Sequence, residues 1–456
     1  MTLHAHPAEA PPSAAAAAAM PYPPAGQAWY CVVVLALAVM VNFLDRGILA
    51  LLIQPIKKDL QLSDMQLSLI MGFAFTFFYA VLGLPVARWI DRGTRKYIFS
   101  AGLGIFAVMT LFCGMANNFW HLFLARMGLG VGETTSGPSA YSLLSDYFPP
   151  HRLSRAISVM QVGFVLGNAG ALLLGGWLVA RVGQTDHVLP LIGEVRGWQA
   201  VLMLISIPGF IVAALMLTVK EPRRRGVKVK DAPISEVFRL ITANKWVYFP
   251  LFAGMGLRSA QMFGSQGWNA ALFERSFGWG PAQYSLVGGL SILVSMPIGL
   301  FLGNLLTEYF VKKGHHDANI RTVVVATLLS VPLGIFYPLM PGPWLASALF
   351  LLASLTSIMV AAPENAAIQT VTPNRLRGQI TFLFLFTMNV IGMGLGPIIV
   401  GALSQYVFGE AGIHYAIALM GVLMGIPALI VFRKGQKPYG EAVARGGAEV
   451  KVEPNW

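Results

Sequence analysis

Ile90-Asp91-Arg92-Gly93-Thr94-Arg95-Lys96 is a short basic stretch that separates two long apolar segments of the chain. Each flanking segment has the roughly 20 mostly apolar residues that a helix needs to cross a bilayer. A loop this short between two such segments indicates two membrane-spanning helices joined on one side of a membrane. The same alternation of apolar segment and polar loop continues outward in both directions.

The composition agrees with a membrane protein. Hydrophobic residues make up 56% of the 456 residues and charged residues only 11%, whereas about 25% of a soluble domain is charged. This argues against a soluble enzyme, a disordered chain and a secreted disulfide scaffold. Cys31 and Cys113 both lie in apolar stretches, so we expect neither a disulfide framework nor a cysteine metal site.

Twelve segments are long and apolar enough to span a bilayer, so we predict an all-α integral membrane protein with twelve transmembrane helices. They lie at residues 29–52, 66–88, 97–117, 120–147, 153–180, 198–219, 246–273, 281–311, 321–340, 343–371, 376–407 and 412–432. The predicted domains are an N-terminal bundle (29–219), a basic linker (220–244), a C-terminal bundle (245–434) and a tail (435–456). Residues 1–28 contain no Lys or Arg, so they are predicted to be a disordered tail and not a signal peptide.

Basic residues are unevenly distributed, and this sets the predicted orientation. Most of the 32 Lys and Arg residues lie in the linker, the C-terminal tail and the loops on that same side. Basic loops stay on the cytoplasmic side, so both termini are predicted to be cytoplasmic and the protein to lie in the inner or plasma membrane. The net charge of +12 therefore reflects topology and predicts no nucleic-acid partner.

Two loops in the first half have counterparts in the second. His151-Arg152-Leu153 follows a proline, and so does Asn374-Arg375-Leu376. The acid-then-basic loop that opens this section likewise corresponds to a later stretch from Glu308 to Lys313. Such matches indicate an internal duplication with parallel halves, an arrangement that secondary transporters use.

Several of these motifs resemble those of one membrane protein family. Gly83 with Asp91-Arg92-Gly93-x-Arg95-Lys96 resembles the helix 2–3 signature of the major facilitator superfamily, and Arg126-x-Gly128-x-Gly130-x-Gly132-Glu133 resembles its helix 4 motif. Asn42-Phe43-Leu44-Asp45-Arg46 and Asp146-Tyr147-Phe148 resemble the Spinster branch. The resemblance implies two six-helix bundles, each built from 3+3 inverted repeats, and transport by rocker-switch alternating access. It also implies a lysophospholipid-like or sphingolipid-like substrate.

Ionisable residues at bilayer depth are costly and normally mark a transport pathway. Six of them stand out, on predicted helices 1, 4, 7 and 10, which the resemblance implies line a central cavity: Asp45, Arg46, Arg126, Glu133, Arg258 and Glu364. Asp45 and Arg126 should lie at similar depth and close enough to pair. We expect Asp45 and Glu133 to carry protons, with Arg126 and Arg46 as competing partners. The alternative is a static ion pair that holds helices 1 and 4 together.

The same set supplies candidate substrate contacts. Arg46, Arg126 and Arg258 suit an anionic headgroup, because a guanidinium binds carboxylate or phosphate in a forked geometry. Gln261 and Asn269 on predicted helix 7 add amides. Glu364 follows Pro363, whose ring should kink helix 10. Contact with substrate and a structural role at that kink both remain open for Glu364.

A cytoplasmic gate is implied by the resemblance: Asp91, Arg95 and Asp146 would latch the two bundles together. The alternative is that these charges only set the topology. Other charged residues of the same loops complete the predicted gate: Arg92, Arg152, Glu308, Lys312, Arg375 and Arg377. On helix 5, Gly163 and Gly167 predict close helix packing.

We therefore expect a secondary active transporter, proton-coupled, that carries an amphipathic lipid-like substrate or an organic anion. A multidrug or organic-anion transporter of the same family is the alternative, and a polytopic enzyme or receptor is less favoured because no histidine constellation lies at depth. The chain has no nucleotide-phosphate loop, so no cofactor is expected and a proton gradient is the predicted energy source. The stretch His315-His316-Asp317 is predicted to be a solvated loop and not a metal site. The protein is expected to be a monomer in the bilayer.

Overall fold

The computed structural model describes residues 21–183, 185–189, 193–225 and 233–447. Twelve membrane crossings follow one another, as predicted, with bounds within a few residues of the expected ones at most ends. The predicted tail at 1–28 lies mostly outside the described residues. Apolarity drives these segments to form helices, because a bilayer leaves every backbone polar group to be satisfied within the segment.

The first six crossings form the N-terminal half. They are α2 (Ala25–Leu60); α3 (Asp64–Ser68), η1 (Leu69–Phe73) and α4 (Ala74–Arg92); α5 (Arg95–Gly114); α6 (Phe119–Glu133) and α7 (Ser136–Tyr147); α8 (Pro150–Arg181); and α9 (Gly197–Thr218). An antiparallel hairpin of β1 (His187–Leu189) and β2 (Gly193–Val195) separates α8 from α9. The sequence analysis did not predict this hairpin.

The last six crossings form the C-terminal half, after a linker helix α10 (Ile234–Ala243). They are α11 (Lys245–Phe277); α12 (Pro281–Lys312); α13 (Ala318–Phe336) with η2 (Tyr337–Leu339); α14 (Pro343–Ile358) and α15 (Ala361–Val371); α16 (Arg377–Thr387), η3 (Met388–Leu395), α17 (Gly396–Leu403) and η4 (Ser404–Phe408); and η5 (Glu410–Gly412), α18 (Ile413–Met420), η6 (Gly421–Gly425) and α19 (Ile426–Ala444). The last helix continues to Ala444, well into the predicted tail.

Within the described residues, ten helices satisfy length and apolarity criteria for a membrane span. The two remaining crossings fail these criteria for different reasons. The fourth is divided at Thr134-Thr135 into α6 and α7, each too short alone, and the seventh, α11, carries Arg258 and several amides. Polar residues inside a spanning helix indicate that it faces an interior and not lipid.

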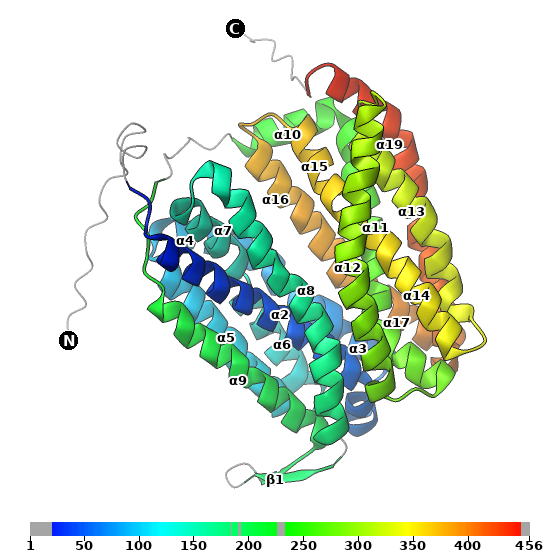
Figure 1. Cartoon of the computed structure of the whole chain (residues 1–456). Coiled ribbons are helices and arrows are strands. Elements are labelled where there is room, and N and C mark those ends of the chain that lie inside the picture. Colours follow the sequence, from blue (N-terminus) through cyan, green and yellow to red (C-terminus); the bar gives the residue numbers. More distant parts are fainter. Residues whose placement is uncertain (1–20, 184, 190–192, 226–232, 448–456) are drawn as a thin grey trace, which may run out of the picture.

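The two halves lie side by side and diverge toward one end of the molecule (Figure 1). We call the end where α2 begins and α19 ends the terminal end, and the opposite end, with β1 and β2, the hairpin end. Where the halves meet, α8 packs on α12, and η1 approaches η3. A Cβ on Gly72 would lie 2.5 Å from the Gly394 carbonyl oxygen, so the two backbones touch there.

Within the N-terminal half, α8 packs closely along α2. A Cβ on Gly163 would lie 2.1 Å from the carbonyl oxygen of Ala36, and one on Gly167 would lie 2.7 Å from that of Met40. No side chain fits at either position. The predicted packing role of these two glycines is therefore confirmed.

The tenth crossing bends where the sequence predicts a proline kink. The helix is interrupted at Met359-Val360, between α14 and α15, just before Pro363. The proline ring collides with the carbonyl four residues earlier, which here is that of Met359, and provides no N–H to bond it.

Candidate functional site

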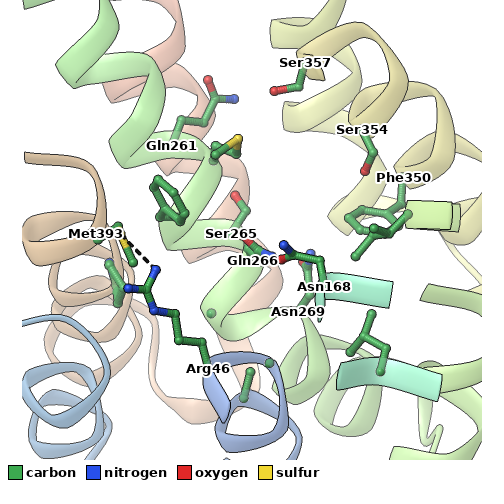
Figure 2. Close-up of a pocket in the computed structure, with 18 of the residues that line it drawn as sticks. Arg46, Asn168, Gln261, Ser265, Gln266, Asn269, Phe350, Ser354, Ser357 and Met393 are labelled. Atoms are coloured by element: carbon green, nitrogen blue, oxygen red, sulfur yellow. Dashed lines mark hydrogen bonds between the residues drawn. The ribbon is translucent and has the colours of Figure 1, made fainter. Parts of the chain in front are cut away.

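A cavity of about 250 Å³ lies between the two halves. Side chains of α2 and α8 contribute one wall, and side chains of α11, α12 and α14 contribute the other. Figure 2 shows polar side chains of α11, among them Gln261 and Ser265, facing Ser354 and Ser357 of α14. Most of the remaining lining is apolar.

Three arginines line this cavity, and their acidic partners do not. Arg46, Arg126 and Arg258 all belong to its wall. Asp45, Glu133 and Glu364, which pair with them, lie outside the lining set. The cavity therefore presents guanidinium groups, each held from behind by a carboxylate. An anion entering it would meet positive groups first.

The predicted pairing of α2 with α6 is present. Arg126 Nη1 donates to Asp45 Oδ2 at 2.6 Å, and both side chains are at least 96% buried. The Thr110 hydroxyl donates to the other oxygen of Asp45 at 3.2 Å. Removing either ion of so deeply buried a pair would strand the other.

Arg46 faces away from Asp45, as expected for neighbours about 100° apart on a helix. Arg46 forms an ion pair with Glu133 through one nitrogen. Its Nη1 reaches only the Met393 sulfur, at 3.6 Å, and the Phe43 and Phe75 rings lie 5.0 and 4.4 Å from the guanidinium. In the described part of the chain, Arg46 Nε and Glu133 Oε2 have no hydrogen-bond partner. This pair therefore forms fewer hydrogen bonds than its guanidinium and carboxylate groups could form.

Arg258 has the acidic partner that its own helix lacks. Its Nη2 donates to Glu364 Oε2 on α15 at 3.0 Å, and its Nη1 donates to the Ser357 carbonyl and hydroxyl oxygens, both at 3.1 Å. The C-terminal half thus repeats the N-terminal arrangement with the charges exchanged: the acid lies on the first crossing of one half and the base on that of the other. Glu364 reaches the cavity only through Arg258.

Gln261 and Asn269 line the cavity as predicted, on one face of α11. Tyr337 donates its hydroxyl to Asn269 Oδ1 at 2.6 Å, which leaves the Asn269 amide oriented by a buried partner. Gln266 donates to Asn168 Oδ1 at 3.2 Å, a bond that joins α11 to α8 across the two halves (Figure 2).

Sequence reasoning missed several lining residues, above all Asn168, Ser354 and Ser357. Asn168 lies between packing glycines, and the two serines lie in an otherwise apolar helix. The available signal was weak: a lone amide in a glycine-rich membrane helix, next to the Gly163 and Gly167 face.

An ion-pair cluster at the hairpin end was also missed. Asp64, at the start of α3, is fully buried and accepts from Arg275 of α11 at 2.7 and 2.9 Å. Ser404 donates to it at 2.7 Å, and Lys57 lies 2.6 Å away. Its backbone N–H donates to Gln405 at 3.1 Å. Asp64 thus joins the two halves at the hairpin end. We call Asp64, Lys57, Arg275 and Ser404 the hairpin-end lock, with Asp64 as its hub.

The predicted gate at the terminal end does not bridge the halves in this structure. Arg95 pairs with Asp146, as expected, and with Glu221 at 2.7 Å, but all three belong to the N-terminal half and its exit into the linker. Arg375 pairs with Glu236 of α10 at 3.1 Å, and among the described residues Arg377 reaches only the Thr372 carbonyl, at 3.5 Å. Six predicted gate residues have no ion pair among the described residues: Asp91, Arg92, Arg152, Glu308, Lys312 and Arg377.

The His315-His316-Asp317 stretch has a structural use. Burial alone would raise the pKa of Asp317, but hydrogen bonds from Arg321, at 3.2 and 3.0 Å, and from Gln436, at 2.6 Å, outweigh it and lower that pKa. Asp317 thereby fastens the start of α13 to α19. Within the described chain, no three His, Cys, Asp or Glu side chains are placed to hold a metal ion.

Two six-crossing halves around a central cavity that three arginines line, closed by ion pairs at one end, define a membrane transporter. A model of the Major Facilitator Superfamily matches residues 35–397, and the chain belongs to that family. It is a multi-pass transporter and not an enzyme.

Individual relatives agree with this assignment. An MFS-type efflux pump of Mycolicibacterium smegmatis is 27% identical over 393 residues, 85% of this chain and 86% of that protein. The hexuronate transporter of Bacillus subtilis is 25% identical, over 87% of this chain and 92% of its own length. Among solved structures, a bacterial homologue of the human lysosomal transporter Spinster, inward-facing and unoccupied, superposes with a TM-score of 0.76 at 25% identity, covering 93% of this chain and 98% of that one. The predicted resemblance to the Spinster branch is confirmed.

Proposed function

We propose that this protein is a proton-coupled transporter of organic anions that also have an apolar part. The observation that carries the proposal is the asymmetry of the buried pairs: Arg46, Arg126 and Arg258 line the cavity, and their carboxylate partners do not. Guanidinium groups in a largely apolar cavity suit a carboxylate or phosphate attached to an apolar body. The similarity to a hexuronate transporter supports an acidic substrate.

Coupling follows from the competition for Arg46. A substrate anion that accepts from Arg46 Nε, which is unbonded among the described residues, or from Nη1, which contacts only the Met393 sulfur, would compete with Glu133 for this guanidinium. Glu133 would then be a desolvated carboxylate without its counterion, and a proton is the remaining way to neutralise it. Substrate binding and protonation would thereby be linked through one side chain. Asp45, held by Arg126 and Thr110, is the second proposed proton carrier.

The proposed conformation is open to the cytoplasm. The hairpin-end lock around Asp64 joins the halves, and the terminal end, which the basic loops assign to the cytoplasm, has no described ion pair between the halves. The similarity to an inward-facing structure supports this assignment. Rocking of the halves would break the lock and bring the Asp91, Arg95 and Asp146 region toward the C-terminal half.

A transport assay in proteoliposomes tests substrate and coupling together. We expect uptake of aromatic or aliphatic carboxylates, or of lysophospholipids, to be stimulated by a pH gradient, and neutral analogues of the same shape to be ignored. A preference for the lysophospholipids would assign a lipid substrate, and a preference for short carboxylates a soluble one. Equal transport of neutral and cationic compounds would reject the anion proposal in favour of a transporter that does not select by charge.

Glu133→Gln tests the coupling step. We expect this variant to lose stimulation by the pH gradient while it still exchanges substrate across the bilayer without a gradient, because the amide keeps the shape but cannot carry a proton. Glu441→Gln, at an exposed position of α19, is the matched control and should behave as the unaltered protein. Full pH-driven uptake by Glu133→Gln would remove Glu133 from the coupling mechanism.

A further inference from the structure

A second cavity, of about 610 Å³, opens at the terminal end of the C-terminal half. Its walls are the first turns of α10, the turn between α15 and α16, and Gly446-Gly447 after α19. Three of its lining residues are arginines from two separate segments: Arg239 on α10, and Arg375 and Arg377 in and directly after the turn, Arg377 being the first residue of α16. We call this cavity the linker cleft.

The linker cleft is short of negative charge. Its one lining carboxylate, Glu236, pairs with Arg375 at 3.1 Å. In the described residues neither Arg239 nor Arg377 has an acidic partner, and Arg377 reaches only a backbone carbonyl at 3.5 Å. Among the described residues, three guanidinium groups face one carboxylate, which leaves two positive charges there without an acidic counterpart. Like charges that converge on one cleft repel each other unless an anion lies between them.

We propose that the linker cleft binds a phosphomonoester group, as a site separate from the transported substrate. Such a group has a charge of about −1.5 to −2 near neutral pH, which matches the two uncompensated guanidinium groups, whereas a carboxylate supplies only one negative charge. Its three oxygens accept forked hydrogen bonds from arginines on different segments. Ser235 and Asn374, which also line the cleft, add neutral donors.

Occupancy would join the linker to the moving helices. Arg239 belongs to the helix between the two halves, and Arg375 and Arg377 lie in and directly after the turn that follows the crossing with Glu364. A phosphate group held by both would fix α10 against that turn. Ile234 and Phe238, on the outer side of α10, are 62% and 55% exposed, so the cleft adjoins an apolar surface suited to the lipid interface. The phosphate can therefore come from a soluble ester or from a lipid headgroup.

Binding of inorganic phosphate to the full-length protein in phosphatidylcholine nanodiscs tests the site. We expect saturable binding that weakens as ionic strength rises, since the arginines are exposed. Arg239→Gln combined with Arg377→Gln should weaken it by at least about tenfold, because two charge-assisted bonds are lost. Arg152→Gln combined with Arg155→Gln removes the same charge from the equivalent loop of the N-terminal half and should leave phosphate binding unchanged.

A variant with the opposite effect separates binding from misfolding. Glu236→Gln frees Arg375 from its carboxylate and should tighten phosphate binding. Nanodiscs that contain phosphatidic acid should compete with inorganic phosphate if the lipid is the source, and those with phosphatidylglycerol, a phosphodiester, should compete less. Unchanged phosphate binding in the phosphatidic acid discs assigns a soluble phosphate ester. The proposal is wrong if the unaltered protein shows no saturable binding, or if both arginine pairs lose it equally.

Discussion

The three buried ion pairs are central to the proposed function, and they differ in how many of their polar atoms form hydrogen bonds. Among the described residues, all three arginines leave Nε without a hydrogen-bond partner, but only the Arg46–Glu133 pair also leaves a buried carboxylate oxygen, Glu133 Oε2, without one. A more completely bonded pair resists exchange of partners, and a less completely bonded one permits it at less cost. This difference places the exchange of partners at Arg46.

The Arg258–Glu364 pair gives a prediction about stability. Arg258→Met should lower the free energy of unfolding by about 3–5 kcal/mol, because Glu364 would be left buried without a counterion. The double variant Arg258→Met/Glu364→Leu should recover much of that loss, since no buried charge remains. Equilibrium unfolding in detergent measures both.

The exposed Arg445–Glu441 pair is the control for this comparison. Its side chains are 74% and 52% exposed at 3.6 Å, so Arg445→Met should change the free energy of unfolding by less than about 1 kcal/mol. Equal losses in the single and double variants of the buried pair would contradict the stranded-charge explanation.

Among the helices, α8 shows how small residues decide the packing of an element. Gly163→Ala should destabilise the protein by about 1–3 kcal/mol, because its Cβ would collide with the backbone of α2 at Ala36. Gly170→Ala, on the same helix with nothing within 4 Å of its Cβ, should be neutral or slightly stabilising. Thermal unfolding of the two variants side by side measures the difference, and similar midpoints would show that α2 can move away.

The elements at the hairpin end give a prediction about conformation. Asp64→Asn removes the charge that holds Lys57 and Arg275, so the hairpin-end lock should weaken and the outward-open population should rise by about tenfold or more. The readout is labelling of Ser265→Cys in the cavity by a membrane-impermeant thiol reagent added at the hairpin end. The two natural cysteines, Cys31 and Cys113, are both buried. Replacing them with alanine removes any background labelling of the natural thiols.

Asp59→Asn is the matched control for the lock. Asp59 lies near the same end and pairs with Arg196 and Trp198, but all three belong to the N-terminal half. Its loss should leave cysteine labelling unchanged. If both variants label Ser265→Cys at the same rate, Asp64 does not hold the halves together.

At the scale of the whole molecule, the orientation remains a prediction from the basic loops. We expect a tag at the C-terminus to be protected from antibody in intact cells, and a tag inserted at the exposed Gly193 in the hairpin to be accessible. Permeabilised cells provide the control, in which both tags should react. The reverse pattern would place the open end of the structure outside the cell.

The number of crossings, the division into halves and the cavity residues Arg46, Arg126, Arg258, Gln261 and Asn269 could be predicted from the sequence. Apolar runs encode membrane helices directly, and ionisable residues inside them are too costly to occur without a use. The break at Thr134-Thr135 and the π-helical turn η3 were harder to predict from the sequence, because both depend on the residues that pack against them. The hairpin and α10 are short elements: the two strands pair with each other, and α10 buries Val237 and Leu240 in the core of the C-terminal half.

The sequence by itself determined that this protein crosses a membrane twelve times and keeps three basic and three acidic residues at depth. The reason is that apolar segments of this length are stable only as helices that span a bilayer. Apart from the predicted pairs Asp45–Arg126 and Arg95–Asp146, only the tertiary structure decided which charges meet. It placed Glu364 behind Arg258, made Asp64 the hub of the hairpin-end lock, and gathered Arg239, Arg375 and Arg377 around one cleft. These contacts join residues far apart in the chain, and helix packing alone sets the distances between them.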